Sequence, residues 1–302
     1  MINIAHVIIS LDVGGAEGML ERLAKESAKN PSIKQSIITL KKSGVIGKRL
    51  TNIRNIDVIS LDMSSIFAAP VTIFKLRKIF KIKNPDIVYT WMYHSDLIGG
   101  LAAYFSGIKN IVWGIRGTKI PQRSFSTTSA LIKICSLLSF YIPKSIVCCA
   151  EAARLAHIDI GYCPKKMIVI PNGYDLSLYN HDPNLKEKVR NDLNISEETL
   201  LVGVVGRFDP LKDFDNFVQA ASLVCKTHHN VKFIMVGRGL DKNNAQLNNW
   251  IQNTSFKDRF ILIGEANPYN FYAAMDIFCL SSKAEGFPNV VAESMAMGVP
   301  CV

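Results

Sequence analysis

Two carboxylates near the end of the chain are spaced so that they can bind different hydroxyl groups of one ligand. Glu285 follows an apolar run and precedes a Gly-Phe-Pro turn, and Glu293 lies eight residues further on. Pro288 suits the first turn of a helix, which would place Glu293 about one and a half turns into that helix. Ordinary surface glutamates need no such turn, so the pattern favours a ligand site.

Two cations follow an earlier apolar run. Arg207 and Lys212 bracket a proline-containing turn in the segment GRFDPLKD (206–213), just before a helical pattern. Two fixed positive charges beside a helix N-terminus suit a diphosphate, because point charges and aligned peptide dipoles both favour negative charge. A solvated charged turn is the alternative explanation for this segment on its own.

Glycines precede the first helical pattern, in the segment GGAE (14–17). Gly15 would allow close approach of the backbone to a ligand, and a helix N-terminus offers free N–H groups to an anion. The spacing of Gly14, Gly15 and Gly18 differs from G-x-G-x-x-G, and the acidic residue expected about 20 residues further on is absent. A plain tight turn therefore explains these glycines as well as a binding loop does.

The elements that must position these groups alternate along the whole chain. Strands are predicted for residues 4–9, 36–40, 57–60, 86–90, 111–115, 145–149 and 167–170, and again for 200–205, 232–236, 260–263 and 277–280. Helical patterns lie between them, for example at 16–29, 71–83, 96–105 and 131–141. This alternation indicates βαβ units and parallel sheets. We expect an α/β protein with two doubly wound domains, 1–171 and 172–302, and the polar segment 172–199 marks their boundary.

The charge of the chain is uneven. The 302 residues carry a net charge of +10. Residues 1–170 hold 23 Lys and Arg against 10 Asp and Glu, a balance of +13, and the rest hold 12 against 15, a balance of −3. A basic half predicts contact with an anionic surface, either membrane or nucleic acid. The seven scattered cysteines predict buried, reduced thiols.

The segment FKLRKIFKIK (74–83) interleaves basic and apolar residues at helical spacing. A surface helix with one core face explains it, and so does contact with anionic lipid. No apolar run approaches the ~18 residues of a membrane-spanning helix, and the first residues contain no basic leader or cleavage site. We expect a cytoplasmic protein, peripheral on the inner face of the membrane. Nucleic-acid binding is not expected, because most aromatic residues lie inside predicted strands and helices.

Several motifs, in this order, resemble the retaining GT-B glycosyltransferases of family 4, especially bacterial enzymes that build capsule, O-antigen and other surface polysaccharides. They are GGAE (14–17), PNGYD (171–175), GRFDPLKD (206–213) and EGFPNVVAE (285–293), with the further phrases TWMYHSDLIGGLAA (90–103) and IVWGIRGT (111–118). The resemblance covers essentially the whole chain. It implies two Rossmann-like domains facing a cleft, the first binding an acceptor and the second a nucleotide-sugar donor.

The resemblance implies a role for each matching position. Arg207 and Lys212 correspond to the basic pair that binds the donor diphosphate and stabilises it as it leaves. Glu285 corresponds to the carboxylate near the donor sugar, Glu293 to the one that holds the nucleotide ribose, and Gly15 to the loop that approaches the phosphates and acceptor. The implied donor site also contains Phe287, Pro288 and Asn289.

The implied reaction is transfer of a hexosyl or N-acetylhexosaminyl group from a nucleotide sugar, expected to be a UDP-sugar, to a lipid-linked or surface polysaccharide acceptor. It would proceed with retention of anomeric configuration and without a cofactor, a metal or an assigned covalent nucleophile. One alternative is a GT-B-fold UDP-amino-sugar epimerase, although no acid and base carboxylates can be placed for it. The other is an inactive, truncated remnant.

Two departures from the family pattern bear on the site and on the end of the chain. Many members have a histidine directly after the strand predicted at 111–115, where this chain has Arg116. His94, expected in a loop, is the candidate for that polar catalytic role, although a lone histidine is often structural. Arg116 and Asn172 are expected to bind the acceptor, Arg116 through a phosphate. The sequence ends at Val302, where the family continues with a strand, a glycine-rich loop and a helix, so we expect an incomplete second sheet with an unprotected edge and reduced stability or activity.

Overall fold

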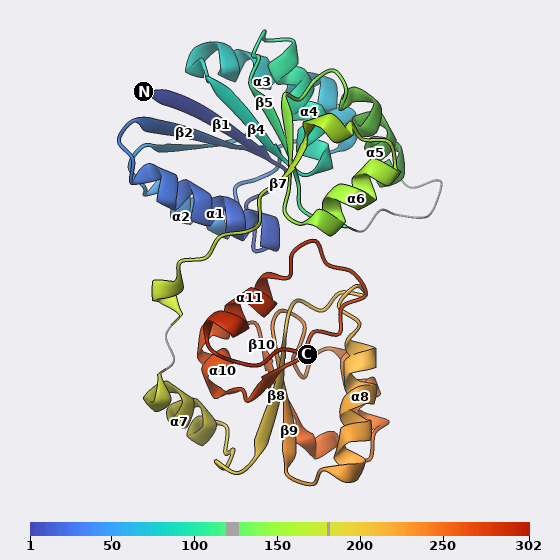
Figure 1. The fold of residues 1–302 in the computed structure, drawn as a ribbon. Coiled ribbons are helices and arrows are strands. Elements are labelled where there is room, and N and C mark those ends of the chain that lie inside the picture. Colours follow the sequence, from blue (N-terminus) through green and yellow to red (C-terminus); the bar gives the residue numbers. More distant parts are fainter. Residues whose placement is uncertain (119–126, 180–181) are drawn as a thin grey trace. The chain divides into compact units, whose positions relative to one another are not determined.

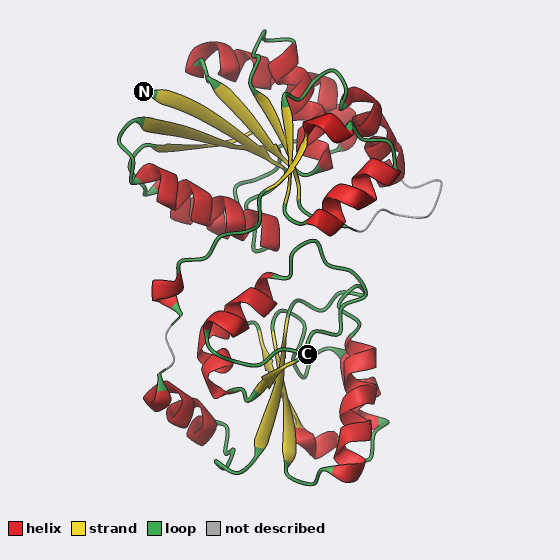
Figure 2. Ribbon diagram, viewed as in Figure 1, coloured by secondary structure: helices red, strands yellow, loops and turns green. Residues whose placement is uncertain are grey.

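The computed structural model describes residues 1–118, 127–179 and 182–302. The chain divides into two compact units, Met1–Gly173 and Tyr174–Val302, a division two residues beyond the expected one. Each unit is a parallel β-sheet with helices on both of its faces (Figures 1 and 2). The predicted α/β architecture with two doubly wound sheets is therefore confirmed.

Unit 1 (Met1–Gly173) contains a seven-stranded sheet in the order β3-β2-β1-β4-β5-β6-β7, with every neighbouring pair parallel. The strands are β1 Ile2–Ile8, β2 Ile33–Thr39, β3 Ile56–Ser60, β4 Ile87–Trp91, β5 Ile111–Ile115, β6 Ser145–Cys148 and β7 Met167–Val169. Strands covered on both faces read as nearly continuous apolar runs. Strand β1 shows this directly, because Ala5, Val7 and Ile8 are completely buried.

Helices α1 and α2 cover one face of this sheet, and α3, α4 and α5 cover the other (Figure 1). The α-helices are α1 Gly15–Ala28, α2 Val45–Thr51, α3 Ala69–Lys83, α4 Tyr93–Tyr104, α5 Thr127–Leu138 and α6 Glu151–Asp159. Two short 3-10 helices are η1 Ile66–Ala68 and η2 Pro164–Lys166. The direction of the crossovers reverses between β1 and β4, so the crevice at their carboxyl ends is where doubly wound sheets bind ligands.

Unit 2 (Tyr174–Val302) has a four-stranded parallel sheet in the order β10-β9-β8-β11. Its strands are β8 Leu200–Val205, β9 Val231–Val236, β10 Phe260–Gly264 and β11 Ile277–Phe278. A parallel bridge joins Phe278 to Cys301 on the outer side of β11. The reversal point here lies between β8 and β11, which makes their carboxyl ends the place to look for a ligand site.

Two apolar cores sandwich the sheet of unit 2. Helices α8 and α9 bury Phe217 and Leu247 on one face, and α7 and α10 bury Val189 and Tyr272 on the other. The α-helices are α7 Pro183–Asp192, α8 Phe214–Thr227, α9 Ala245–Gln252, α10 Pro268–Ala274 and α11 Asn289–Ala296. Two 3-10 helices are η3 Leu176–Leu178 and η4 Lys257–Arg259.

The polar segment 172–199 is not only a boundary, because α7 inside it belongs to the core of unit 2. Arg190 on α7 is buried, and its guanidinium donates to the Asp276 carboxylate at 3.1 Å and to the carbonyl of Ala274 at 3.1 Å. Burial alone would raise the pKa of Asp276, but hydrogen bonds from Leu201 N–H, Lys186 and Arg190 outweigh it and lower that pKa. This network attaches α7 to the start of β11, which polarity alone could not predict.

The cysteines are reduced, and the described helices are too short or too polar to span a membrane. All seven cysteines are free thiols; five are buried, and Cys279 and Cys301 are half-buried. In residues 1–118, 127–179 and 182–302, no helix has the length and apolar character needed to cross a bilayer.

Candidate functional site

The loops after β8 and β11 bring a cation and a carboxylate together at the carboxyl edge of the unit 2 sheet. Lys212 lies in the first loop and Glu285 in the second, and Nζ of Lys212 is 2.6 Å from Oε1 of Glu285. Both side chains are about one-fifth exposed, at 23% and 21%. The sequence singled out both residues for a donor site, and the structure shows that they form an ion pair with each other.

Three further contacts hold these two loops together. The hydroxyl of Ser281 donates to the carbonyl of Lys212 at 2.7 Å, and the N–H of Lys283 donates to the carbonyl of Leu211 at 2.8 Å. The ammonium of Lys283 also pairs with Asp213 at 2.9 Å. The backbone position of Lys212 relative to Glu285 is therefore fixed by interactions that do not involve either side chain.

Arg207, the other predicted cation, has a different partner. Its guanidinium lies 3.3 Å from the carboxylate of Asp209, and the side chain is 55% exposed. Because an exposed ion pair contributes little stability, Arg207 can exchange Asp209 for a ligand at small cost. The two cations expected to act together are thus bound to separate carboxylates in this structure.

Glu293 is the fifth residue of α11 and is almost completely buried. The phenol of Tyr272, on α10, donates to Oε2 of Glu293 at 3.2 Å. Burial, and next the charge of Glu293, raise the pKa of Tyr272, so its phenol keeps the proton that it donates. Pro288, expected in the first turn, is instead the residue that caps α11. Tyr272 therefore orients the carboxylate that the sequence predicted as a ribose ligand.

The turn before α11 is held by a tyrosine that the sequence analysis did not single out. The phenol of Tyr174 donates to the side-chain oxygen of Asn289 at 2.6 Å. Its ring stacks on Phe287, with ring centroids 6.4 Å apart and planes inclined by 26°. Tyr174 belongs to the PNGYD segment, but no spacing in the sequence connects it to residues more than a hundred positions away.

One glycine that the sequence analysis did not single out, Gly237 at the end of β9, packs against Gly206 of the GRFDPLKD segment at the end of β8. Gly237 has φ +140°, and a Cβ there would lie 2.0 Å from the carbonyl oxygen of Gly206. Only glycine allows this backbone geometry and this close approach. The N–H of Phe208 donates to the carbonyl of Arg238 at 2.8 Å, so the loops that follow the two strands run side by side. The sequence Gly237-Arg238-Gly239, directly after the strand predicted at 232–236, could have indicated this tight loop.

In unit 1, Arg116 lies at the carboxyl end of β5 on an aromatic surface. Its guanidinium carbon is 4.3 Å from the centre of the Trp91 ring. One terminal nitrogen donates to Asn172 Oδ1 at 2.9 Å and the other to the phenol of Tyr89 at 3.2 Å. The two residues predicted to bind the acceptor, Arg116 and Asn172, are therefore in contact. Tyr89 and Trp91 were not predicted, although their alternation along β4 places them on one face.

The groups in contact with the Arg116 guanidinium are an amide, a phenol and an indole ring, all of them neutral. Across residues 1–118, 127–179 and 182–302, Arg116 forms no salt bridge. Asp96 is completely buried and accepts a hydrogen bond from the hydroxyl of Thr90 at 2.5 Å. Burial raises the pKa of Asp96 to about 7, against smaller opposing effects of hydrogen bonds and of Arg116. Below about pH 7 Asp96 is therefore mostly protonated, and the groups that hydrogen-bond to Arg116 are neutral, which favours binding of an anion by its guanidinium.

His94 lies in the first turn of α4, not in a loop as expected. Met92, with φ 70°, precedes the helix, and its N–H donates to the carbonyl of Gly114 at 3.0 Å. This bond starts α4 immediately after β4, which is why no loop intervenes. Burial, and next the charge of Lys41, lower the pKa of His94. Its half-buried imidazole is therefore mostly neutral near pH 7, a form that can accept or donate a hydrogen bond.

Gly15 is the first residue of α1 and is exposed. A Cβ on the preceding Gly14 would lie 2.3 Å from Oε2 of Glu17. Glycine at position 14 thus makes room for the Glu17 carboxylate, which lies against the helix N-terminus. Negative charge there already interacts favourably with the helix dipole, so a phosphate at Gly15 requires Glu17 to move.

The described residues contain no group of three or more His, Cys, Asp or Glu side chains arranged to hold a metal ion. An Asp-x-Asp sequence does occur at Asp213-Phe214-Asp215. Its first carboxylate is paired with Lys283, and Phe214 between the two is buried in the core under α8.

Comparison with known proteins identifies the family. A model described as glycosyltransferase family 4 matches residues 13–178, which is more than half of the chain. The chain belongs to glycosyltransferase family 4. A second model, described as glycosyl transferases group 1, matches residues 186–302 of this family 4 chain.

Two relatives of this family 4 chain have names that specify diphosphoundecaprenol-linked saccharides. It is 27% identical over 256 residues to the Escherichia coli UDP-Gal:alpha-D-GlcNAc-diphosphoundecaprenol alpha-1,3-galactosyltransferase, covering 82% of this chain and 63% of that protein. It is 30% identical over 231 residues to the Campylobacter jejuni N-acetylgalactosamine-N,N'-diacetylbacillosaminyl-diphospho-undecaprenol 4-alpha-N-acetylgalactosaminyltransferase, covering 75% and 60%. The chain thus spans only about three-fifths of the length of these relatives.

Among solved structures, Anabaena HepE in complex with UDP and glucose superimposes with a TM-score of 0.84 at 21% identity. That match covers 100% of the family 4 chain and 80% of HepE. The glycosyltransferase WaaG matches with a TM-score of 0.76 at 15% identity, covering 99% and 80%. These similarities establish the GT-B fold for this chain.

Proposed function

We propose that this chain transfers a sugar from a UDP-sugar to a lipid-linked saccharide, with retention of anomeric configuration. Unit 2 binds the donor through Lys212, Arg207, Glu285 and Glu293, and unit 1 binds the acceptor. The observation that carries the proposal is the Lys212–Glu285 pair, held at 2.6 Å where the strand order of the unit 2 sheet reverses. Ligands of doubly wound sheets bind at this point.

The donor diphosphate replaces the carboxylates that hold the two cations of this site. Lys212 and Arg207 are each bound to one carboxylate, and a diphosphate carries more charge than a single carboxylate. As the sugar–phosphate bond breaks, further negative charge develops on the diphosphate, and preorganised cations stabilise that charge. In this proposal, the Glu285 carboxylate exchanges its contact with Lys212 for hydroxyl groups of the donor sugar. The proposed mechanism needs no metal and no covalent nucleophile.

Glu293 binds the nucleotide ribose in this proposal. Its Oε2 already accepts a hydrogen bond from Tyr272, and the carboxylate oriented in this way accepts from a ribose hydroxyl in the proposed complex. Phe287, Pro288 and Asn289 form the turn beside it, and Tyr174 fixes that turn through Asn289 and Phe287. A carboxylate that is oriented before binding loses less entropy on binding, which strengthens the complex.

Arg116 binds a phosphate of the acceptor in this proposal, and Asn172 positions its guanidinium. The planar guanidinium matches phosphate geometry and stacks on aromatic rings, which a lysine would not reproduce. His94, with its lowered pKa, is proposed as a neutral hydrogen-bonding group for the substrates. Relatives whose names specify diphosphoundecaprenol acceptors support a lipid-diphosphate-linked acceptor. Such an acceptor would place the protein on the cytoplasmic face of the membrane.

A thermal-shift screen against UDP, GDP, ADP and a panel of UDP-sugars tests the donor site. Saturation at about 100 times Kd stabilises the folded protein by about 2.7 kcal/mol. We expect a shift with UDP or with one UDP-sugar that is lost in Arg207→Ala and in Glu293→Ala. Lys283→Ala is the matched control, because it removes a lysine from the same loops but not from the proposed site. No shift with any nucleotide, or an equal loss in the control, would contradict the proposal.

A further inference from the structure

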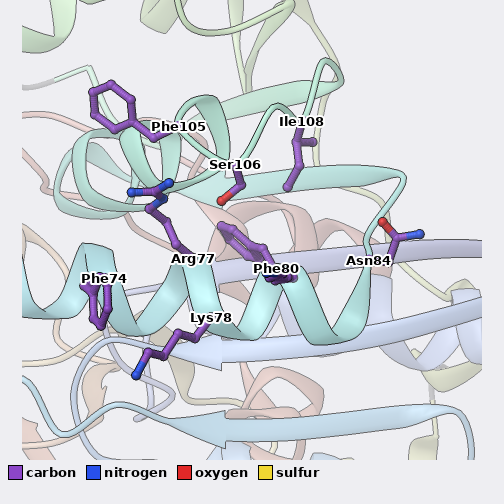
Figure 3. A pocket seen from close by; sticks show the side chains of 9 residues that line it. Phe74, Arg77, Lys78, Phe80, Asn84, Phe105, Ser106 and Ile108 are labelled. Carbon is purple, nitrogen blue, oxygen red and sulfur yellow. The ribbon is translucent and has the colours of Figure 1, made fainter.

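A groove lies between α3 and the end of α4, on the outside of unit 1. It has a volume of about 490 Å³ and is lined mainly by aromatic and basic side chains. The lining residues are Phe74, Arg77, Lys78, Phe80, Lys81 and Phe105, together with Asn84, Ser106 and Ile108. Figure 3 shows Arg77 extending from α3 towards the end of α4 that carries Phe105. No carboxylate lines this groove, so all of its charged lining residues are basic.

Helix α3 is apolar on two opposite faces. Thr72, Leu76 and Phe80 are buried towards the sheet at a spacing of four residues. On the solvent side, Phe67 in η1 is 91% exposed and Ile82 is 79% exposed. Val71 and Phe74 lie between them and are also exposed, so these apolar residues form a stripe along the outer face, which also carries the exposed Lys75 and Lys78. A helix whose only role is to cover the sheet needs no second apolar face.

The charge of α3 has a single sign. Its 15 residues include five Lys or Arg and no Asp or Glu. Lys83 pairs with Asp57 at 2.8 Å, whereas the ion pairs of the described residues include none from Lys75, Arg77, Lys78 or Lys81. Lys78 instead lies 4.7 Å from the centre of the Phe74 ring. Cations beside an exposed apolar stripe match the charge and polarity of an anionic bilayer surface.

We infer that the α3–α4 face docks unit 1 onto an anionic phospholipid bilayer. The stripe of Phe67, Val71, Phe74 and Ile82 enters the headgroup layer, and the groove accepts a lipid phosphate between Arg77, Lys78 and Lys81. This inference rests on the proposed function, since a lipid-linked acceptor is presented in a membrane. It adds to that function a defined lipid site away from the carboxyl edge of the sheet.

Vesicle sedimentation tests the docking face. Wild-type protein is compared on vesicles of phosphatidylcholine alone and of phosphatidylcholine mixed with phosphatidylglycerol. Each basic residue near the surface contributes about 1 kcal/mol, or about fivefold in binding. We expect the triple substitution Arg77→Gln, Lys78→Gln, Lys81→Gln to lower binding to the anionic vesicles about a hundredfold. Phe67→Ala with Phe74→Ala is expected to lower it about tenfold without changing the charge.

A triple substitution in unit 2, Lys188→Gln, Lys226→Gln and Lys257→Gln, is the matched control, because it removes the same net charge from exposed lysines elsewhere. It is expected to bind vesicles as the wild type does. Equal binding of the wild type to both vesicle types, or an equal loss in the control, would overturn the inference. It would also be overturned if inorganic phosphate stabilised only the wild type while vesicles did not bind, since the groove would then take a soluble anion.

The response to UDP, measured by thermal shift on the same proteins, separates this inference from the proposed function. A normal UDP shift with no vesicle binding would overturn the docking face and leave the donor site in place. Vesicle binding with no UDP response would support the docking face and contradict the donor assignment.

Discussion

Each sheet places a cation just after the carboxyl end of one of its strands, but the two cations have different surroundings. In unit 2, Lys212 follows β8 and is bound to Glu285 at 2.6 Å. In unit 1, Arg116 follows β5 and is held by the face of Trp91, the amide of Asn172 and the phenol of Tyr89. A carboxylate partner must be given up when an anionic ligand binds, whereas neutral partners can remain in place.

This difference suits the two proposed ligands. In the proposed mechanism, the departing diphosphate would be bound by a lysine that exchanges partners, and Lys212 would pair with Glu285 again after the product leaves. An acceptor phosphate that keeps its charge throughout is bound by an arginine whose orientation is fixed in advance. Unit 2 would therefore respond to substitution mainly in turnover, and unit 1 mainly in acceptor affinity.

The largest effect is expected from Lys212→Ala. It removes the proposed cation from the departing diphosphate and leaves Glu285 without its partner, so turnover should fall by about 10²–10³-fold, as for other preorganised groups that stabilise developing charge. Steady-state kinetics with saturating donor and acceptor measure it. Lys283→Ala should retain near wild-type turnover. If both variants lost activity equally, the distinction between Lys212 and its neighbours would fail.

Arg116→Ala is expected to act on the acceptor. Hydrogen bonds to charged groups are worth about 1.5–3 kcal/mol, so the acceptor KM should rise roughly 10- to 100-fold while the UDP thermal shift stays unchanged. Arg116→Lys keeps the charge but loses the planar fork and should lie between the two. A fall in kcat without a change in acceptor KM would show that Arg116 and Lys212 share one role.

Tyr272→Phe removes only the hydrogen bond that orients Glu293. The cost of such a bond is about 1 kcal/mol, and the Kd for UDP should rise about fivefold. Isothermal titration with UDP measures it. Tyr269→Phe, which removes a phenol from the same helix, is the control. An unchanged Kd in Tyr272→Phe would mean that Glu293 needs no orienting partner.

The smallest effect concerns the buried acid near Arg116. Because the pKa of Asp96 is raised to about 7 in the folded state, the folded protein keeps a proton that the unfolded chain releases above about pH 4. Stability from this residue is therefore lost as pH rises from about 4 to about 7, by at most about 1.4 kcal/mol per pH unit.

Asp96→Asn lacks this titration, so its Tm relative to the wild type should increase between pH 5 and pH 8, values that bracket the midpoint of about 7. Thermal melts at both pH values measure the difference. A constant difference in Tm across this range would show that Asp96 is ionised throughout, and Arg116 would then have a charged partner after all.

Local patterns in the sequence predicted most of the fold. Strands β5 and β8 have the predicted bounds, and the others differ by a few residues at their ends. Short, nearly continuous apolar runs are a property of neighbouring residues, so the sequence alone could locate them. The sequence did not predict helix α7 as part of unit 2, because α7 is attached through Arg190 to Asp276, a residue far along the chain. Its polar surface carried no sign of that buried contact.

The site was predictable by residue type but not by pairing. Spacing and resemblance identified Lys212, Glu285, Glu293 and Arg116, yet neither could show that Lys212 binds Glu285 or that Tyr272 orients Glu293. Such contacts depend on which strand edges become neighbours, and the order β10-β9-β8-β11 is a property of the whole sheet. For the same reason the sequence placed His94 in a loop, although Met92 starts a helix there.

The buried Arg190 has a consequence for synthesis on the ribosome. Its partners Ala274 and Asp276 emerge more than eighty residues after it, whereas every strand of the first sheet lies before residue 170. Domains of a growing chain generally fold as units, the earlier ones first. Unit 1 can therefore fold before the residues that bind Arg190 on α7 have been synthesised. During that interval α7 would expose an unpaired guanidinium and the apolar side of Val189, which makes it a natural place for a chaperone to bind the nascent chain.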